Sequence, residues 1–211
     1  MQKLLLSLTL ALFVLSGCTT HNTTIIEDTG PTAAQLFDDG KNLYNQSQYD
    51  AAINSFNEAV RIDPSYADAH YWAGRSYEKL NNNNGAVSSY KAALDIQPGH
   101  ADANFYLGVV YFNTYQYTPA EAHLQKSKAV DAANPYSYYY LAEIYKKQGK
   151  CKLPKTLYNK ALSLKSDLYD AKEGLAYVAK NNCKPKKPAA KKFEKVNDFR
   201  GGGKALKESE W

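Results

Sequence analysis

The side chains that most often carry catalysis or bind metals are few and scattered in this chain. Its four histidines (His21, His70, His100 and His123) follow no metal-ligand spacing, and its three cysteines include no CxxC pair, so we predict no metal site. No HExxH, GxSxG or glycine-rich phosphate-binding motif is present. Three consecutive glycines begin at Gly201 without a lysine–serine ending, and we interpret them as a linker. The sequence predicts a protein that is not an enzyme and has no cofactor.

The N-terminus carries chemistry of a different kind, the attachment of a protein to a membrane. Lys3 precedes an apolar run of 12 residues, Leu4 to Leu15, which is shorter than the roughly 20 residues that a membrane-spanning helix needs. This pattern predicts a secretory signal peptide at residues 1–17. The segment Leu15-Ser16-Gly17-Cys18 resembles the lipobox of bacterial lipoproteins, which implies cleavage before Cys18 and lipidation of its thiol. A signal peptide with an incidental cysteine is the alternative.

The residues after Cys18 indicate where such a lipoprotein would stay. In that family an aspartate directly after the cysteine favours retention in the inner membrane, and this chain has Thr19. The resemblance therefore implies a lipid anchor on the periplasmic face of the outer membrane, if the source is a diderm bacterium. Residues 18–31 comprise the lipidated cysteine and a polar segment without helical periodicity, which predicts a tether.

The body of the chain is an internal repeat, and this repeat must position any binding surface. Gly40, Gly74, Gly108 and Ala142 are evenly spaced along the chain. Three further columns keep the same spacing: Ala52, Ala86 and Ala120; Phe56, Tyr90, Leu124 and Tyr158; Ala59, Ala93, Ser127 and Ala161. A fixed period of this length, about 34 residues, predicts one supersecondary unit stacked on copies of itself.

Each unit is predicted to be a pair of helices. In the first unit Leu36, Gly40 and Leu43 share one helical face, and a polar break follows at residues 46–48. The second helix ends at Asp63-Pro64, because the residue before a proline avoids the helical conformation. The glycine lets the two helices of the unit approach closely.

The periodic residues resemble those of the tetratricopeptide repeat (TPR). The second unit carries the TPR signature most fully, in Trp72-Ala73-Gly74, Tyr77, Ala86, Tyr90, Ala93 and Pro98. The resemblance implies an all-α fold, a right-handed α-solenoid of four TPR helix-turn-helix units over residues 32–181. The units are predicted at residues 33–66, 67–100, 101–134 and 135–168, and a C-terminal capping helix is predicted at 169–181.

Three prolines bear on where the helices begin. Pro135 stands later than the prolines that close the first two units, so we expect a different turn at the exit of the third unit. Pro154 takes the place of an alanine, and we expect it in the first turn of a helix, where its missing N–H costs little. Pro119 is predicted to be the first residue of a helix.

The TPR resemblance also implies where a partner binds. In TPR proteins the first helix of each unit lines a concave groove, and the positions that point into it carry over to Phe37, Lys41, Tyr44, Tyr71, Arg75, Glu78, Phe105, Val109, Phe112, Tyr139, Glu143 and Lys146. Phe37, Tyr71, Phe105 and Tyr139 form an aromatic stripe in this set. Aromatic rings anchor many interfaces, but they also pack neighbouring helices, and both interpretations stay open. The lysine and asparagine of the family's carboxylate clamp are replaced by Phe37 and Lys41, so binding of a free C-terminal carboxylate is not expected.

Two late cysteines are candidates for a disulfide. An exported chain lives in an oxidising compartment, so we predict a bond between Cys151, in the turn of the fourth unit, and Cys183, after the capping helix. Two unpaired thiols are the alternative.

The C-terminal residues 182–211 form a basic tail that we predict to be flexible. Residues 183–211 carry nine Lys/Arg against four Asp/Glu, an excess equal to the net charge of +5 of the whole chain. The basic cluster would suit an anionic glycan or lipid and comprises Lys184, Lys186, Lys187, Lys191 and Lys192. A solvated tail is the alternative, and nucleic acid is not an expected partner of an exported, anchored chain.

These features together predict an adaptor. It would be anchored to the outer membrane and would bind another envelope protein or peptide through its TPR groove. Among known families it is similar to repeat lipoproteins that assist the assembly of pili and secretins. One alternative is a scaffold for peptidoglycan enzymes, and another is an envelope-binding module that uses the basic tail.

Overall fold

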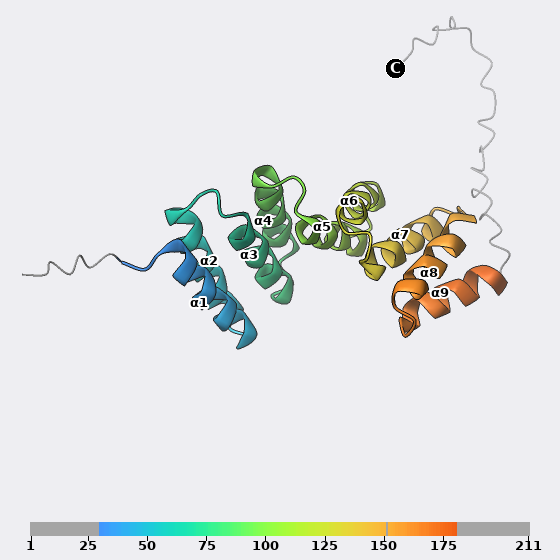
Figure 1. Cartoon of the computed structure of the whole chain (residues 1–211), viewed down its shortest axis with the longest axis horizontal. Helices are drawn as coiled ribbons and strands as arrows, with labels where there is room; N and C mark the ends of the chain where they lie inside the picture. The colour runs from blue at the N-terminus through green and yellow to red at the C-terminus, as the bar shows by residue number, and fades with distance from the viewer. Residues whose placement is uncertain (1–29, 151, 181–211) are drawn as a thin grey trace, which may run out of the picture. The chain divides into compact units, whose positions relative to one another are not determined.

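The structure is a computed structural model that describes residues 30–150 and 152–180. Within these residues the chain forms nine α-helices and no β-strand (Figure 1). The helices are α1 (Ala33–Asn45), α2 (Tyr49–Ile62), α3 (Ala67–Lys79), α4 (Asn83–Ile96), α5 (Ala101–Asn113), α6 (Tyr117–Val130), α7 (Pro135–Lys147), α8 (Lys152–Leu164) and α9 (Tyr169–Lys180). None of the helices in this described part is long and apolar enough to cross a membrane.

All nine of these helices belong to one compact unit. The predictions for Cys18, for the Cys151–Cys183 bond and for the basic tail concern positions outside the described residues.

The helices keep the period of the sequence. The first helix of each unit and then α9 begin at evenly spaced residues, namely Ala33, Ala67, Ala101, Pro135 and Tyr169. Each helix packs against the next one along the chain, so the described residues form a stack of helix pairs closed by a single helix. The prediction of an all-α helical-repeat solenoid is confirmed.

The core of each unit is built from the periodic columns. The largest residues of these columns are fully buried: Phe56, Tyr90, Leu124 and Tyr158. In the first unit a Cβ added to Gly40 would lie 2.6 Å from the ring of Phe56, and Gly74 and Gly108 repeat this close approach. Packed interiors leave no room for such an overlap, so these positions require glycine.

In the fourth unit, the glycine that makes room for the large buried ring lies on a different helix. It has Ala142 where the first three units have glycine, so a methyl group occupies the space beside α7. The ring of Tyr158 lies against Gly174 of α9 instead, where an added Cβ would be 2.4 Å from the ring atom Cζ. The capping helix therefore completes the packing of the fourth unit.

The turn between the two helices of each unit contains one residue in the left-handed conformation. These residues are Ser47, Asn81, Tyr115 and Gly149, with φ of 61°, 57°, 62° and 73°. They too recur once per unit at a constant spacing. Glycine and asparagine adopt this conformation readily, whereas a tyrosine with positive φ is strained.

Two of the three prolines lie in the first turn of a helix. Pro135 is the first residue of α7, and the side chain of Asn134 caps this helix by accepting a hydrogen bond from the backbone N of Tyr136 at 2.9 Å. This cap gives the third unit an exit turn of its own. Pro154 lies in the first turn of α8.

The predicted start of a helix at Pro119 is wrong by two residues, because α6 begins at Tyr117. The backbone N of Gln116 donates to the carbonyl of Tyr111 at 2.8 Å, which closes the turn before this point. A proline at the third position still lies among the helical residues whose N–H has no partner within the helix.

Candidate functional site

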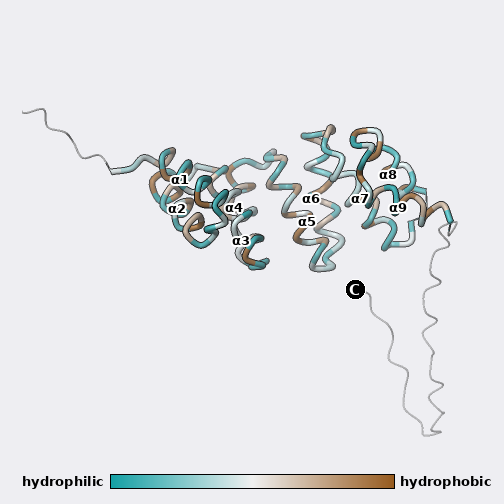
Figure 2. The backbone as a smooth tube through the Cα atoms, turned by 90° about the horizontal axis from the view of Figure 1, so that it is seen from below, coloured by the Kyte–Doolittle hydropathy of each residue, from teal (hydrophilic) through white to brown (hydrophobic). Residues whose placement is uncertain are grey.

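Helices α1, α3, α5, α7 and α9 form one closely spaced side of the stack. Each of them contacts the next of the set, whereas no two of α2, α4, α6 and α8 contact each other. The first helices therefore lie closer together than the second helices, as in the groove-forming side of other solenoids. We call this surface the first-helix face. Its middle helix, α5, is largely apolar (Figure 2).

Three rings of the predicted aromatic stripe are packed into the fold. Phe37, Tyr71 and Phe105 are only 9%, 7% and 8% exposed. Phe37, for example, has its ring centroid 4.8 Å from that of Tyr66. The structure thus assigns these three rings a packing role, whereas Tyr139, the fourth member of the stripe, is only partly buried.

In the first unit, the predicted groove residues make local contacts. The Nζ of Lys41 lies 3.2 Å from an oxygen of Asp38 and 4.8 Å from the centroid of the Phe37 ring. The ring of Tyr44 packs edge-on against Trp72 of the next unit, with centroids 5.2 Å apart. Tyr44 therefore links the first unit to the second.

Arg75 is the centre of a cluster in the second unit. Its guanidinium donates to the hydroxyls of Tyr71 at 3.1 Å and Tyr44 at 3.4 Å, and its Nε lies 3.6 Å from a carboxylate oxygen of Glu78. Its face lies 3.8 Å over the ring of Tyr106. The cluster joins three units through one cation, and little of the guanidinium is left for a partner.

Glu78 also connects this cluster to the core. The hydroxyl of the buried Tyr90 donates a hydrogen bond to Glu78. Burial, and then the charge of Glu78, raises the pKa of the Tyr90 hydroxyl, so the tyrosine keeps its proton and remains the donor. Burial raises the pKa of Glu78 too, and the bond from Tyr90 opposes that change.

The third unit presents an apolar surface on the first-helix face. Val109 is buried, and Phe112 is partly buried. The Phe112 ring lies 5.8 Å from that of Tyr117 and 5.3 Å from that of Tyr140. This aromatic patch suits an apolar side chain of a partner.

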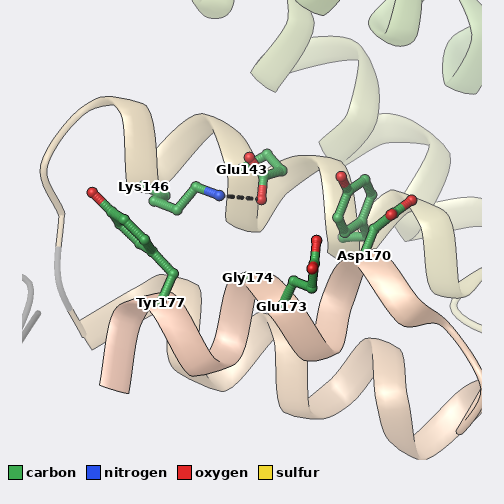
Figure 3. A pocket seen from close by; sticks show the side chains of 7 residues that line it. Glu143, Lys146, Asp170, Glu173, Gly174 and Tyr177 are labelled. Carbon is green, nitrogen blue, oxygen red and sulfur yellow. Dashed lines mark hydrogen bonds and ion pairs between the residues drawn. The ribbon is translucent and has the colours of Figure 1, made fainter. Parts of the chain in front are cut away.

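Between α7 and α9 lies a pocket of about 420 Å³ (Figure 3). It is lined by the groove residues predicted for the fourth unit together with four residues of α9: Tyr139, Glu143, Lys146, Asp170, Glu173, Gly174 and Tyr177. We call it the α7–α9 pocket. Figure 3 shows Lys146 and Glu143 directed toward each other from α7.

The charges at the base of this pocket are paired. Glu143, which is buried, accepts hydrogen bonds from the Nζ of Lys146 and from the hydroxyl of Tyr158, each at 2.5 Å. Burial, and then this bond to Glu143, raises the pKa of the Tyr158 hydroxyl, which therefore stays a donor. Lys146 also lies 5.5 Å from the centroid of the Tyr177 ring.

The four residues of α9 in this pocket, Asp170, Glu173, Gly174 and Tyr177, are absent from the predicted groove set, because the sequence predicts α9 only as a cap. A signal for two of them is present in the sequence. Glu173 follows Tyr139 by one period of the repeat, and Tyr177 follows Glu143 by the same step. The first-helix face therefore continues onto the capping helix.

Two of the described histidines, His100 and His123, make side-chain contacts within the fold. The Nδ1 of His100 accepts a hydrogen bond from the backbone N of Ala103 at 3.2 Å, which caps α5, and its Nε2 lies 3.0 Å from an oxygen of Asp68. Burial lowers the pKa of His70, and it is also the largest of the causes that lower the pKa of His123. In the part of the chain that the structure describes, no three His, Cys, Asp or Glu side chains are grouped so as to hold a metal ion.

Comparisons with known proteins agree with this architecture. A family profile described as TPR repeat matches residues 40–81 and 74–114. No curated protein matches the sequence significantly.

Several solved structures have the same fold. A crystal structure of MamA is 22% identical over 68% of this chain and 84% of its own, with a TM-score of 0.64. MamA from Desulfovibrio magneticus RS-1, residues 41 to the end, is 20% identical over 72% and 86%, with a TM-score of 0.67. YrrB, described as a TPR protein with an unusual peptide-binding site, is 18% identical over 67% and 73%, with a TM-score of 0.59. The described part of this chain is thus a helical solenoid of the tetratricopeptide-repeat type.

Proposed function

We propose that this protein is a non-catalytic adaptor that binds another protein or a peptide through its first-helix face. The observation that carries the proposal is a pair of neighbouring surfaces on that face. An aromatic patch lies on the third unit, and a charged pocket follows on the fourth unit and α9. An apolar patch beside a polar pocket is typical of surfaces that recognise peptides and proteins. The TPR-type fold supports the same function.

We further propose that the adaptor acts in the bacterial envelope, tethered to the outer membrane by lipid on Cys18. The support is the N-terminal sequence alone. Changing Cys18 to Ser should move the protein from the membrane fraction to the soluble fraction, because the acyl chains provide the attachment. If the variant, exported with a signal peptide that is cleaved independently of Cys18, remains with the membranes, the lipid anchor is wrong.

Within the envelope, the functional analogy that the sequence favours is to lipoproteins that assist pilus or secretin assembly. A scaffold for peptidoglycan enzymes would use the same face, whereas an envelope-binding module would use the basic tail at residues 182–211. The first two differ only in the partner, so identification of the partner separates them.

The proposed function is tested by photo-crosslinking in intact cells. A crosslinking amino acid is placed at Phe112 or Tyr177 on the first-helix face, and at Glu58 or Lys160 on second helices as matched exposed controls. We expect one partner, identified by mass spectrometry, from the first pair of positions and not from the controls. The same products from all four positions, or none from any, would contradict the adaptor function.

Deletion of residues 182–211 separates the groove from the tail. The adaptor predicts that this truncated protein still captures its partner, and that Phe112→Ala with Tyr177→Ser reduces the capture. These two positions are better targets than the buried rings of Phe37, Tyr71 and Phe105, whose removal would damage the fold. Loss of capture on tail deletion alone would favour the tail-based module.

A further inference from the structure

The α7–α9 pocket lies where the capping helix lacks a periodic aromatic residue. In the second and third units the sixth residue of the first helix is Trp72 or Tyr106, and each stacks on the large residue of the preceding second helix. The ring centroids are 6.5 Å apart for Phe56 and Trp72, and 6.3 Å apart for Tyr90 and Tyr106. In α9 this position is Gly174, which lines the pocket and lies against the ring of Tyr158.

The second and fourth units show how the missing ring changes the chemistry. In the second unit, Arg75 is the protein's own cation, and it lies 3.8 Å over the Tyr106 ring. In the fourth unit the residue at the position of Arg75 is Glu143, an anion, and it faces a pocket instead of a ring. In the fourth unit the cation is instead Lys146, which is paired with Glu143 and lies 5.5 Å from the centroid of the Tyr177 ring.

The lining of the pocket has an excess of negative charge. Three carboxylates, Glu143, Asp170 and Glu173, face one ammonium group, that of Lys146, which leaves a formal charge of −2. Glu143 is already matched by Lys146. Asp170 and Glu173 are exposed on α9 at the mouth of the pocket, and Figure 3 shows both side chains directed toward α7.

We propose that the α7–α9 pocket binds a cationic side chain of the partner, and arginine in preference to lysine. This inference rests on the proposed function. The planar guanidinium can stack on the rings of Tyr139 and Tyr177 while its N–H groups donate to Asp170 and Glu173. The pocket, at about 420 Å³, is large enough for one such side chain. An anionic group would instead meet three carboxylates.

The partner is a separate protein, and the basic tail of this chain is the competing occupant. The tail follows α9 directly and holds eight lysines but one arginine in residues 183–211. A pocket that prefers guanidinium therefore discriminates against most of the tail, although tethering raises the local concentration of the tail.

The test uses the full-length protein in detergent with 3-fluorotyrosine at position 177 and, as a control, at the remote exposed Tyr115. The probes are N-acetyl-arginine amide, the lysine analogue, and N-acetyl-citrulline amide, a neutral molecule of nearly the same shape. We expect the fluorine resonance at position 177 to shift with arginine at millimolar concentration, less with lysine and least with citrulline. The resonance at position 115 should not move. Equal shifts with arginine and citrulline would overturn the proposal.

The matched variants remove two charges without changing shape. Asp170→Asn with Glu173→Gln should weaken arginine binding about tenfold, which is the effect of about 1.4 kcal/mol. Asp50→Asn with Glu58→Gln removes two charges from α2 and should leave the binding unchanged. If both variants weaken arginine binding equally, the binding depends only on the net charge of the protein, and the pocket is not the binding site.

Two further outcomes separate this inference from others. If arginine shifts the resonance only in a chain that ends at Lys180, the tail covers the pocket, and the assignment to a separate partner is wrong. If crosslinking captures a partner but arginine shows no preference over citrulline, the adaptor function stands and this inference falls. If the pocket clearly prefers arginine but no partner is captured, this inference stands and the adaptor function falls.

Discussion

Tyr115 is the residue whose conformation fits its side chain least. It occupies the left-handed position of the turn between α5 and α6 at φ 62°, where the fourth unit has Gly149. Its side chain is 79% exposed, so burial does not compensate for the strain.

We expect Tyr115→Gly to raise the free energy of unfolding by about 0.5–1 kcal/mol, because relief of roughly 1–2 kcal/mol of strain outweighs the greater freedom of glycine in the unfolded chain. Urea denaturation followed by circular dichroism measures the change. Tyr115→Ala is the matched control, since it removes the ring but keeps the Cβ, and it should not stabilise. Equal effects of the two variants would show that the ring, and not the backbone, is responsible.

At the scale of the residue, the sequence predicted the position of each residue within its unit but not how far its side chain is buried. Phe37 and Tyr139 hold the same position in their units, yet Phe37 is buried against Tyr66 and Tyr139 opens onto a pocket. The difference comes from the neighbouring residues: Phe37 lies against the ring of Tyr66, whereas Tyr139 shares the lining of the pocket with Gly174. Exposure in a stack depends on such contacts between units, and the period alone does not encode them.

At the scale of the helix, Gly174 shows how a local preference is overruled by packing. Alanine in place of glycine within a helix normally stabilises by about 1 kcal/mol. In α9, however, the added Cβ would meet the fully buried ring of Tyr158, whose hydroxyl is held by Glu143.

We therefore expect Gly174→Ala to destabilise the protein by about 1–3 kcal/mol, as overpacked cores do. Thermal unfolding and urea denaturation measure this. Gly99→Ala is the control, because nothing lies within 4 Å of its added Cβ, and it should be neutral or slightly stabilising. Adding Ala142→Gly should recover part of the loss by returning clearance to the fourth unit. If Gly174→Ala stabilises the protein, the ring of Tyr158 is free to move and our account of the fourth unit is wrong.

The start of α6 shows a limit of prediction at the same scale. Pro119 indicated a helix start, but the residues before it also become helical once the turn from α5 is closed by the bond between Gln116 and Tyr111. The period predicted the existence, type and order of the helices, since small and large residues alternate in fixed columns. It could not predict boundaries that depend on the geometry of one turn.

At the scale of the whole molecule, α9 is the helix that stabilises the last unit of the stack. It covers a cluster that includes the fully buried Ala142, Tyr158 and Ala161. Solenoids need such a cap, because a terminal unit cannot bury its inner face alone.

A chain that ends at residue 168 should therefore lose more helical signal than the 12 residues of α9 account for, because α7 and α8 lose part of their core. Its melting temperature should fall by about 2–4 °C for each kcal/mol lost. The matched control is a chain that ends at Lys180, which keeps α9 and removes only the tail. A loss of signal in proportion to α9, with an unchanged melting temperature, would show that the fourth unit is stable without its cap.

The contacts between helices have a consequence for how quickly the chain reaches this structure. Every pair of helices in contact stands one or two places apart along the chain. Because no distant segments have to find each other, the search is short, and helical proteins with such local contacts fold within microseconds to milliseconds. During synthesis, each new unit can close on the one before it. The growing chain then exposes about one unfinished unit at a time, which limits the surface available for aggregation.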